Sequence, residues 1–89
     1  MSKNQSKKKR GQYQVILNDD SFNTFDHVID CLIEICGHNY YQAVQCATIT
    51  HNAKQCSIFI DTWEMCVDVY EELVKEGLSV MVTKYEKTN

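Results

Sequence analysis

The fold is decided by residues 15–38, which read VILNDDSFNTFDHVIDCLIEICGH. In this stretch six apolar residues recur at helical spacing and share one face: Phe25, Val28, Ile29, Leu32, Ile33 and Cys36. The acidic residues between them face the other way. Asn23 or Thr24 can cap the start of this helix, and Gly37 can adopt the left-handed conformation that ends it. The stretch therefore predicts an amphipathic helix from about Phe25 to Gly37.

Two further elements flank this helix. Residues 13–17, YQVIL, are apolar and partly β-branched, and they predict a strand that ends in the turn Asn18-Asp19-Asp20. Downstream, Asn39 can cap a second helix over about 40–50, with His51 at its end. The face of that helix suits close packing because its residues are small: Ala43, Val44, Cys46 and Ala47.

The C-terminal half predicts a strand, a helix and a last strand. Residues 55–61, QCSIFID, alternate, so we expect a core face made of Cys56, Ile58 and Ile60. Asp61 and Glu64 resemble a capping box that opens a third helix, which Gly77 ends. Its inward residues are expected to be Cys66, Val69, Tyr70, Leu73 and Val74. Residues 78–84 predict the last strand.

These elements predict an α+β fold with the order β-α-α-β-α-β, in which a compact three-stranded antiparallel sheet has three helices packed on one face. A chain of 89 residues with no proline and three glycines holds one core. We expect this domain to span residues 13–85, after a flexible basic arm at 1–12 and before a C-terminal tail at 86–89.

The five cysteines are at positions 31, 36, 46, 56 and 66. The chain has no apolar stretch near the ~18 residues of a membrane span, and its N-terminus lacks the apolar run of a secretory signal. We therefore expect a cytoplasmic protein whose thiols are free and mostly buried. Successive cysteines are five or ten positions apart, whereas zinc sites use pairs such as C-x2–4-C, so we expect no metal and no cofactor.

Charge is divided between the arm and the domain. The first eleven residues carry +5, from four lysines and one arginine, and removing them from the net charge of −3 leaves −8 on the remainder. A basic arm suggests nucleic acid, but an acidic domain repels phosphate and the arm has no aromatic residue for base stacking. We expect neither nucleic acid nor a membrane as a partner.

The residues also argue against an enzyme. Catalysis needs a nucleophile beside a base, or carboxylates that converge in a cleft. Asp19 and Asp20 are adjacent in a turn, where such side chains point apart and satisfy the turn backbone. The chain has no glycine-rich phosphate loop and no nucleophile elbow. We expect no catalytic residue.

Hydrogen-bond acceptors gather at the end of the first strand. Asn18, Asp19 and Asp20 offer oxygens, and His51 offers an imidazole from a segment that can converge on them. An ammonium group fits such a set because each of its protons can take a charge-assisted hydrogen bond. An amine beside an apolar pocket on the first helix describes the first residue of a peptide. The ordinary alternative, a turn and cap with a structural histidine, stays open.

A resemblance to the Clp protease adaptor family ClpS covers about residues 13–84, on the run YQVILNDD…NTFDHVIDCLIEICGHNYYQAVQCATITH…C. That family has a strand ending in NDD, a helix entered through a short threonine-containing turn, and a histidine that closes the second helix. The resemblance implies a compact α/β fold and an adaptor that performs no chemistry. Such an adaptor binds an N-degron, a bulky N-terminal Leu, Phe, Tyr or Trp, and delivers its bearer to a Clp AAA+ unfoldase for degradation.

Carried over residue by residue, the resemblance implies contacts with the substrate and with the unfoldase. The residues at the α-amino positions are Asn18, Asp19, Asp20 and His51, of which Asp20 can instead brace the loop. The residues at the hydrophobic-pocket positions are Phe25, which is the gate, Val28, Leu32 and Thr50. Glu64 occupies a docking position for the N-terminal domain of a ClpA- or ClpC-type unfoldase. The basic arm corresponds to the family's N-terminal extension, and we expect a monomer.

The loop after Asp20 departs from the family pattern. It is one residue longer, with Ser21 and Phe22 before Asn23 and Thr24, while the distance from Tyr13 to Phe25 is unchanged. The strand can therefore end one residue early, and the amine contacts can be Asn18 with Asp19 or Asp19 with Asp20. A longer loop can also close the pocket, which leaves an alternative function: a ClpS-like protein-interaction module without degron binding.

Two later positions also depart from the pattern. Lys54 replaces the usual glycine three residues after the histidine, so we expect this turn to avoid the left-handed conformation. Val69 replaces a lysine used in docking, so docking uses other contacts or is absent.

Overall fold

The structure, a computed structural model, describes residues 12–86. Its elements are strand β1 (Tyr13–Asn18), helix α1 (Phe25–Glu34), helix α2 (Tyr40–Ala53), strand β2 (Gln55–Asp61), helix α3 (Trp63–Lys75) and strand β3 (Val80–Lys84). This order confirms the predicted α+β fold class, although α2 continues beyond its expected end to Ala53. The predicted basic arm and C-terminal tail fall almost entirely on residues 1–11 and 87–89, which lie outside the described residues.

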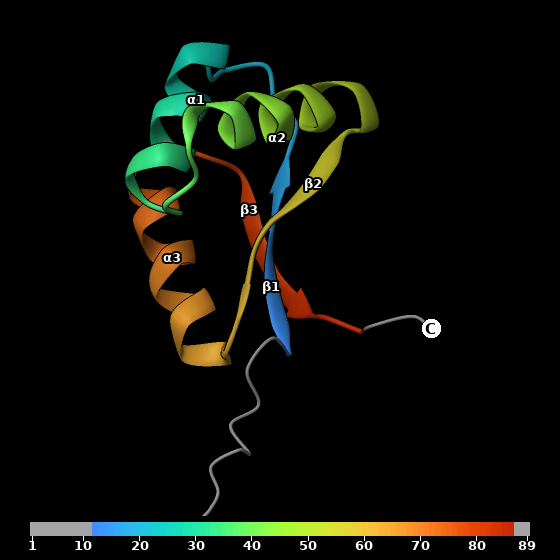
Figure 1. Cartoon of the computed structure of the whole chain (residues 1–89), viewed down its shortest axis with the longest axis vertical. Helices are drawn as coiled ribbons and strands as arrows, with labels where there is room; N and C mark the ends of the chain where they lie inside the picture. The colour runs from blue at the N-terminus through green and yellow to red at the C-terminus, as the bar shows by residue number, and fades with distance from the viewer. Residues whose placement is uncertain (1–11, 87–89) are drawn as a thin grey trace, which may run out of the picture.

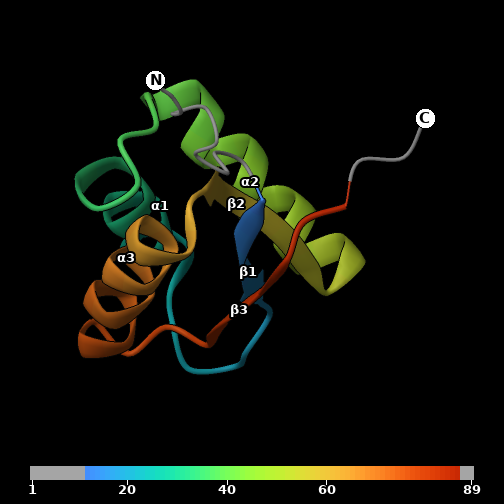
Figure 2. The ribbon, with the colours of Figure 1, turned by 90° about the horizontal axis from the view of Figure 1, so that it is seen from below.

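The sheet has β1 at its centre, in the order β2-β1-β3. Both neighbours run antiparallel to β1, so that Tyr13 lies opposite Asp61 on one side and Lys84 on the other. Figure 1 shows α1 and α3 along one side of the sheet, with α2 lying across the end toward which β1 runs. The view from below in Figure 2 again places α1 and α3 on the same side.

Strand β2 contains a β-bulge opposite β1. The pairing shifts between Val15 and Ile16 and skips Ile58. Because a bulge adds one residue to its strand, it reverses the alternation beyond it. Phe59 therefore pairs with Val15 and packs against the core, while Ile60 is 43% exposed. The prediction that Ile60 faces the core is wrong for this reason.

Each helix begins at a side chain that accepts a hydrogen bond from a backbone N–H of the first turn. These N-cap residues are Thr24, Asn39 and Thr62. Asp61 was expected to cap the third helix, but it still belongs to β2, and its Oδ1 accepts from the backbone N–H of Thr62 at 2.7 Å. The helix therefore starts one residue later than the capping-box pattern indicated.

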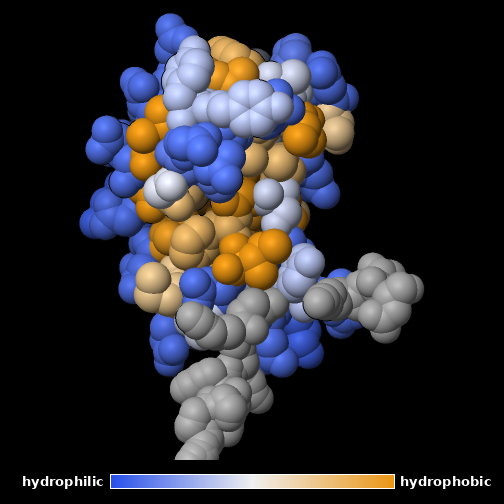
Figure 3. Space-filling view, viewed as in Figure 1, coloured by the Kyte–Doolittle hydropathy of each residue, from blue (hydrophilic) through white to orange (hydrophobic). Residues whose placement is uncertain are grey.

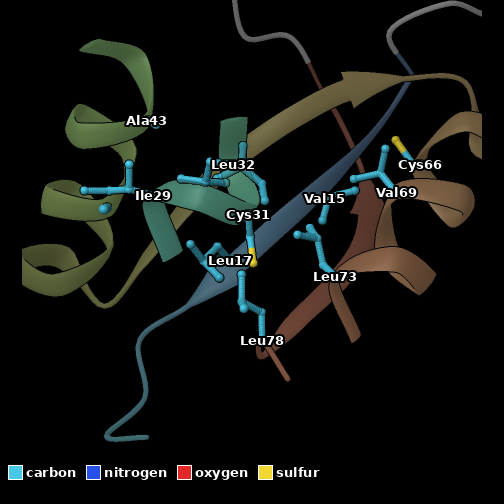
Figure 4. Close-up of a cluster of buried hydrophobic side chains, with 12 residues drawn as sticks. Val15, Leu17, Ile29, Cys31, Leu32, Ala43, Cys66, Val69, Leu73 and Leu78 are labelled. Carbon is cyan, nitrogen blue, oxygen red and sulfur yellow. The ribbon is translucent and has the colours of Figure 1, made fainter. Parts of the chain in front are cut away.

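The core lies between the sheet and the helices. Figure 4 shows side chains from β1 and from all three helices meeting in one cluster. On α3 the inward positions Cys66, Val69 and Leu73 are buried as predicted, whereas Val74 is 47% exposed. Consecutive helical residues lie about 100° apart around the axis, so a narrow contact stripe that includes Leu73 turns Val74 to solvent.

The described residues contain all five cysteines, and each is free, as expected. Cys31 and Cys66 are buried, and the others are half-buried. Between residues 12 and 86, the helices are too short or too polar to cross a bilayer.

Candidate functional site

A cavity of about 290 Å³ opens where the loop after β1 meets α1 and α2. The residues that line it are Leu17, Asp19, Asp20, Ser21, Asn23, Phe25, Val28, Ala47, Thr50 and His51. Six of these were singled out in the sequence: Asp19, Asp20, Phe25, Val28, Thr50 and His51. The fold therefore brings most of the predicted acceptors and pocket residues to one place.

The inner part of the cavity is apolar. Leu17 and Ala47 are nearly fully buried, and Val28 packs at the edge of the core. Thr50 is also buried, and its hydroxyl donates to the carbonyl of Cys46 at 2.8 Å. Because this bond satisfies the hydroxyl within its own helix, the cavity can hold an apolar group without stranding a polar one.

Asp19 presents a carboxylate at the rim. Its backbone N–H donates to the carbonyl of Lys54 at 2.9 Å, which fixes the end of β1 against the turn after α2. Its side chain is 27% exposed, with Oδ1 3.9 Å from Nδ1 of His51 and Oδ2 3.5 Å from Nζ of Lys54. Since an ionised carboxylate has about four acceptor positions, Asp19 can accept further hydrogen bonds from a cationic ligand.

Lys54 adopts the left-handed conformation, with φ +78° and ψ −16°, at the C-cap of α2. The prediction that this turn avoids that conformation is wrong. The backbone carbonyl of Lys54 accepts from the N–H of Asp19, and its ammonium pairs with the Asp19 carboxylate. These two contacts hold Lys54 in the left-handed conformation. Non-glycine residues pay about 1–2 kcal/mol for this conformation, so the turn is under local strain.

Asp20 is committed to the loop. Its Oδ1 accepts from the backbone N–H groups of Phe22 and Asn23, and its Oδ2 accepts from Nδ2 of Asn23, all at 2.8 Å. Burial acts to raise the pKa of Asp20, but these hydrogen bonds outweigh it and lower the pKa below 3.8. Asn23 also donates to the carbonyl of Gly77 at 3.0 Å, so the brace reaches the end of α3.

Three of the predicted site residues lie elsewhere. Asn18 is the last residue of β1, and its Oδ1 accepts from Nε2 of Gln55 at 3.1 Å. Leu32 is fully buried in the core rather than at the cavity. Glu64 is exposed in the first turn of α3, and Figure 1 shows this turn at the opposite end of the sheet from the loop after β1.

Four of the lining residues were not predicted to belong to the site: Leu17, Ser21, Asn23 and Ala47. Ala47 carried a usable signal, because it lies one turn before Thr50 and His51 on the same helix. No pattern in the sequence indicates the contact of Lys54 with Asp19, because this contact depends on the left-handed backbone conformation of Lys54.

The chemistry of the cavity combines an acceptor rim with an apolar floor. Asp19, Asp20 and His51 lie on the rim, and Phe25 and Val28 are at its helical wall. Such a site can bind a cation that is attached to an apolar group.

The comparisons with known proteins agree with this architecture. The family described as ATP-dependent Clp protease adaptor protein ClpS matches residues 8–81. The solved structure of Agrobacterium tumefaciens ClpS2 bound to L-phenylalaninamide is similar in fold, with a TM-score of 0.77 and 16% sequence identity, over 85% of this chain and 100% of that chain. The comparison with curated proteins found no match. Because the family match covers most of its length, the chain belongs to the ClpS family of ATP-dependent Clp protease adaptor proteins.

Proposed function

We propose that this adaptor binds the N-terminal residue of its substrate proteins in the cavity between the loop after β1, α1 and α2. The observation that carries the proposal is the carboxylate of Asp19, which is partly exposed at the rim of a small cavity with an apolar floor. In this arrangement Asp19 accepts from the α-ammonium group, and the imidazole of His51 provides a second acceptor.

The size of the cavity supports a ligand of one residue. At about 290 Å³ it is at the lower end of the range for small-molecule sites, roughly 300–1,000 Å³. Its apolar floor suits the bulky N-terminal residues Leu, Phe, Tyr and Trp, because burial of their side chains favours binding. The A. tumefaciens relative is bound to L-phenylalaninamide, an apolar side chain with a free amine, which is the ligand chemistry that we propose here.

The partner in this proposal is the N-terminal domain of a Clp AAA+ unfoldase of the ClpA or ClpC type. Glu64 is exposed at the start of α3, at the other end of the sheet from the cavity. The two surfaces are therefore separate, so a substrate and the unfoldase can be held at once. We propose that the protein acts in the cytoplasm, as a monomer and without catalysis.

The test is a titration of fluorescent peptides that differ only in their first residue. Peptides that begin with Phe, Leu, Tyr or Trp should bind, and peptides that begin with Gly or Glu should not. Equal binding of all of them would contradict the proposal. Binding of none of them would favour the interaction module without degron recognition, in which Lys54 remains paired with the Asp19 carboxylate.

A further inference from the structure

A second cavity, of about 340 Å³, lies between α1 and α3. Its lining comes from α1 and its C-cap and from the end of α3: His27, Asp30, Cys31, Glu34, Ile35, Glu72 and Glu76. None of these residues lines the cavity of the proposed function. The ribbon in Figure 2 shows α1 and α3 beside each other, and Figure 3 shows that the surface over them, at its left margin, is mainly hydrophilic.

Three side chains of different chemistry converge in this cavity. His27 and Cys31 are one turn apart on α1, and Glu76 is the C-cap residue of α3. One ligand atom from each, an imidazole nitrogen, a sulfur and a carboxylate oxygen, lies within 4.8 Å of the others. His27 and Glu76 are 49 positions apart in the chain, so the spacing of cysteines and histidines does not reveal the group.

The distance between the histidine nitrogen and the cysteine sulfur matches the geometry of a tetrahedral zinc site. Nε2 of His27 is 3.6 Å from Sγ of Cys31. In tetrahedral zinc sites the Zn–N bond is about 2.0–2.1 Å and the Zn–S bond about 2.3 Å, which separates the two ligand atoms by about 3.6 Å. The two side chains therefore already stand at the distance that a shared zinc ion requires.

The negative charge around His27, Cys31 and Glu76 favours the binding of a cation. Asp30, Glu34, Glu72 and Glu76 line the cavity, and from residue 12 to residue 86 no lysine or arginine does. The carbonyl of Glu76, at the negative end of α3, accepts from Nε2–H of His27 at 2.9 Å. A divalent cation would offset this negative charge and stabilise the thiolate.

We propose that His27, Cys31 and Glu76 form a binding site for Zn²⁺, with the remaining coordination position left to water. On binding, the imidazole of His27 changes tautomer, so that its proton moves from Nε2 to Nδ1 and Nε2 bonds the metal instead of donating to the Glu76 carbonyl; Cys31 releases its thiol proton to solvent. The mixed nitrogen, sulfur and oxygen ligands suit Zn²⁺ and Co²⁺ rather than Mg²⁺ or Ca²⁺, which prefer oxygen ligands only.

The metal would join α1 to the end of α3. Glu76 precedes Gly77, whose carbonyl accepts from Asn23 in the loop after β1. Zn²⁺ should therefore raise the midpoint of thermal unfolding, since a ligand that binds only the folded state stabilises it.

The test is a titration of the reduced, metal-free full chain with Zn²⁺ against a chelator of known affinity, together with Co²⁺ absorption spectroscopy. We expect one Zn²⁺ per chain and, with Co²⁺, a thiolate-to-metal charge-transfer band. His27→Ala and Glu76→Gln should each weaken binding roughly tenfold or more. The control Glu71→Gln changes an exposed carboxylate on the same helix that lies outside the cavity, and it should change nothing.

Cys31 is buried, so Cys31→Ser can fail to fold. The His27 and Glu76 variants and the cobalt spectrum test the site without this substitution. The three half-buried thiols need a separate control, because Cys46 lies near Cys36 and Cys56 and these thiols could also bind a metal. Cys46→Ser should retain full Zn²⁺ affinity. The proposal is overturned by the absence of stoichiometric Zn²⁺, by bound Co²⁺ without a thiolate band, or by affinity that depends on Cys46 and not on His27.

Discussion

Asp19 and Asp20 are adjacent aspartates with different surroundings. Asp20 accepts three hydrogen bonds from its own loop, whereas the carboxylate of Asp19 pairs with the exposed ammonium of Lys54 and lies near the exposed ring of His51. The sequence left open whether Asn18 or Asp20 accompanies Asp19 at the ligand. The bond between Asn18 and Gln55 draws Asn18 away from the cavity, and the loop uses Asp20 as a brace. Asp19 is then the main carboxylate available to an amine.

This division predicts opposite effects for the two substitutions. Asp19→Ala should weaken binding of a Phe-first peptide roughly tenfold or more, because it removes a charge-assisted hydrogen bond, and should change the free energy of unfolding by less than about 0.5 kcal/mol. Asp20→Ala should lower the free energy of unfolding by about 1–2 kcal/mol. Urea unfolding and peptide titration measure the two quantities. A large loss of stability in Asp19→Ala, or none in Asp20→Ala, would reverse the assignment.

The contribution of Asp20 should also depend on pH. Its pKa is lowered in the folded state, so its stabilisation is present above the ordinary value of 3.8 and is lost as the pH falls through the lower folded value. The difference in unfolding free energy between the wild type and Asp20→Ala should therefore be constant from pH 5 to 7 and shrink in more acidic solution. A difference that persists unchanged below about pH 3 would contradict this ionic role.

Lys54 is strained by its left-handed backbone and competes for Asp19 through its ammonium. Lys54→Gly should raise the free energy of unfolding by about 1 kcal/mol, since glycine adopts this conformation without a Cβ clash. It should also raise the affinity for a Phe-first peptide about two- to fivefold, as expected for loss of an exposed ion pair. Lys54→Asn is the matched control, because it removes the charge while keeping a Cβ. If Lys54→Asn does not raise the affinity, Lys54 does not compete with the ligand.

Helix α1 serves the core and the cavity with the same apolar stripe. Ile29 and Leu32 are buried, while Val28 and Phe25 reach the cavity. The spacing of apolar residues predicts this helix and its caps well, because both are local properties of the chain. The bulge in β2, which turns Ile60 outward, depends on pairing with β1 and leaves no mark in the alternation of 55–61. The family resemblance placed Leu32 in the pocket, but Leu32 is buried in the core, because the neighbouring elements cover that part of the helix face.

Phe25 is predicted to limit which first residues enter the cavity. It is 47% exposed, so Phe25→Ala should cost little stability while widening the entrance. The ratio of affinities for Phe-first and Val-first peptides should fall in this variant. Phe22→Ala is the matched control, since Phe22 is 91% exposed and does not line the cavity. An unchanged ratio in Phe25→Ala, or an equal fall in Phe22→Ala, would show that Phe25 is not the gate.

All five cysteines of this small protein pack in its single core or against it. Burial, together with the neighbouring Cys46, raises the pKa of Cys36 to about 12 and that of Cys56 to about 11. A raised pKa stabilises the fold fully below the ordinary value of 9.0, and the effect is lost as the pH rises toward the folded values. The protein should therefore lose stability between pH 9 and 11. Cys36→Ala should lose less over this range in urea unfolding, and an identical loss would exclude Cys36 as a cause.

In the proposed function, the cavity recognises a free N-terminal amine beside an apolar side chain. Fluorescence anisotropy should compare two peptides of identical sequence beginning with Phe, one with a free and one with an acetylated N-terminus. Acetylation removes the positive charge and two of the three N–H donors, so affinity should fall at least about tenfold, and the Asp19→Ala variant should no longer distinguish the two peptides. Equal affinity of the wild type for both peptides would show that the cavity does not recognise the N-terminal amine.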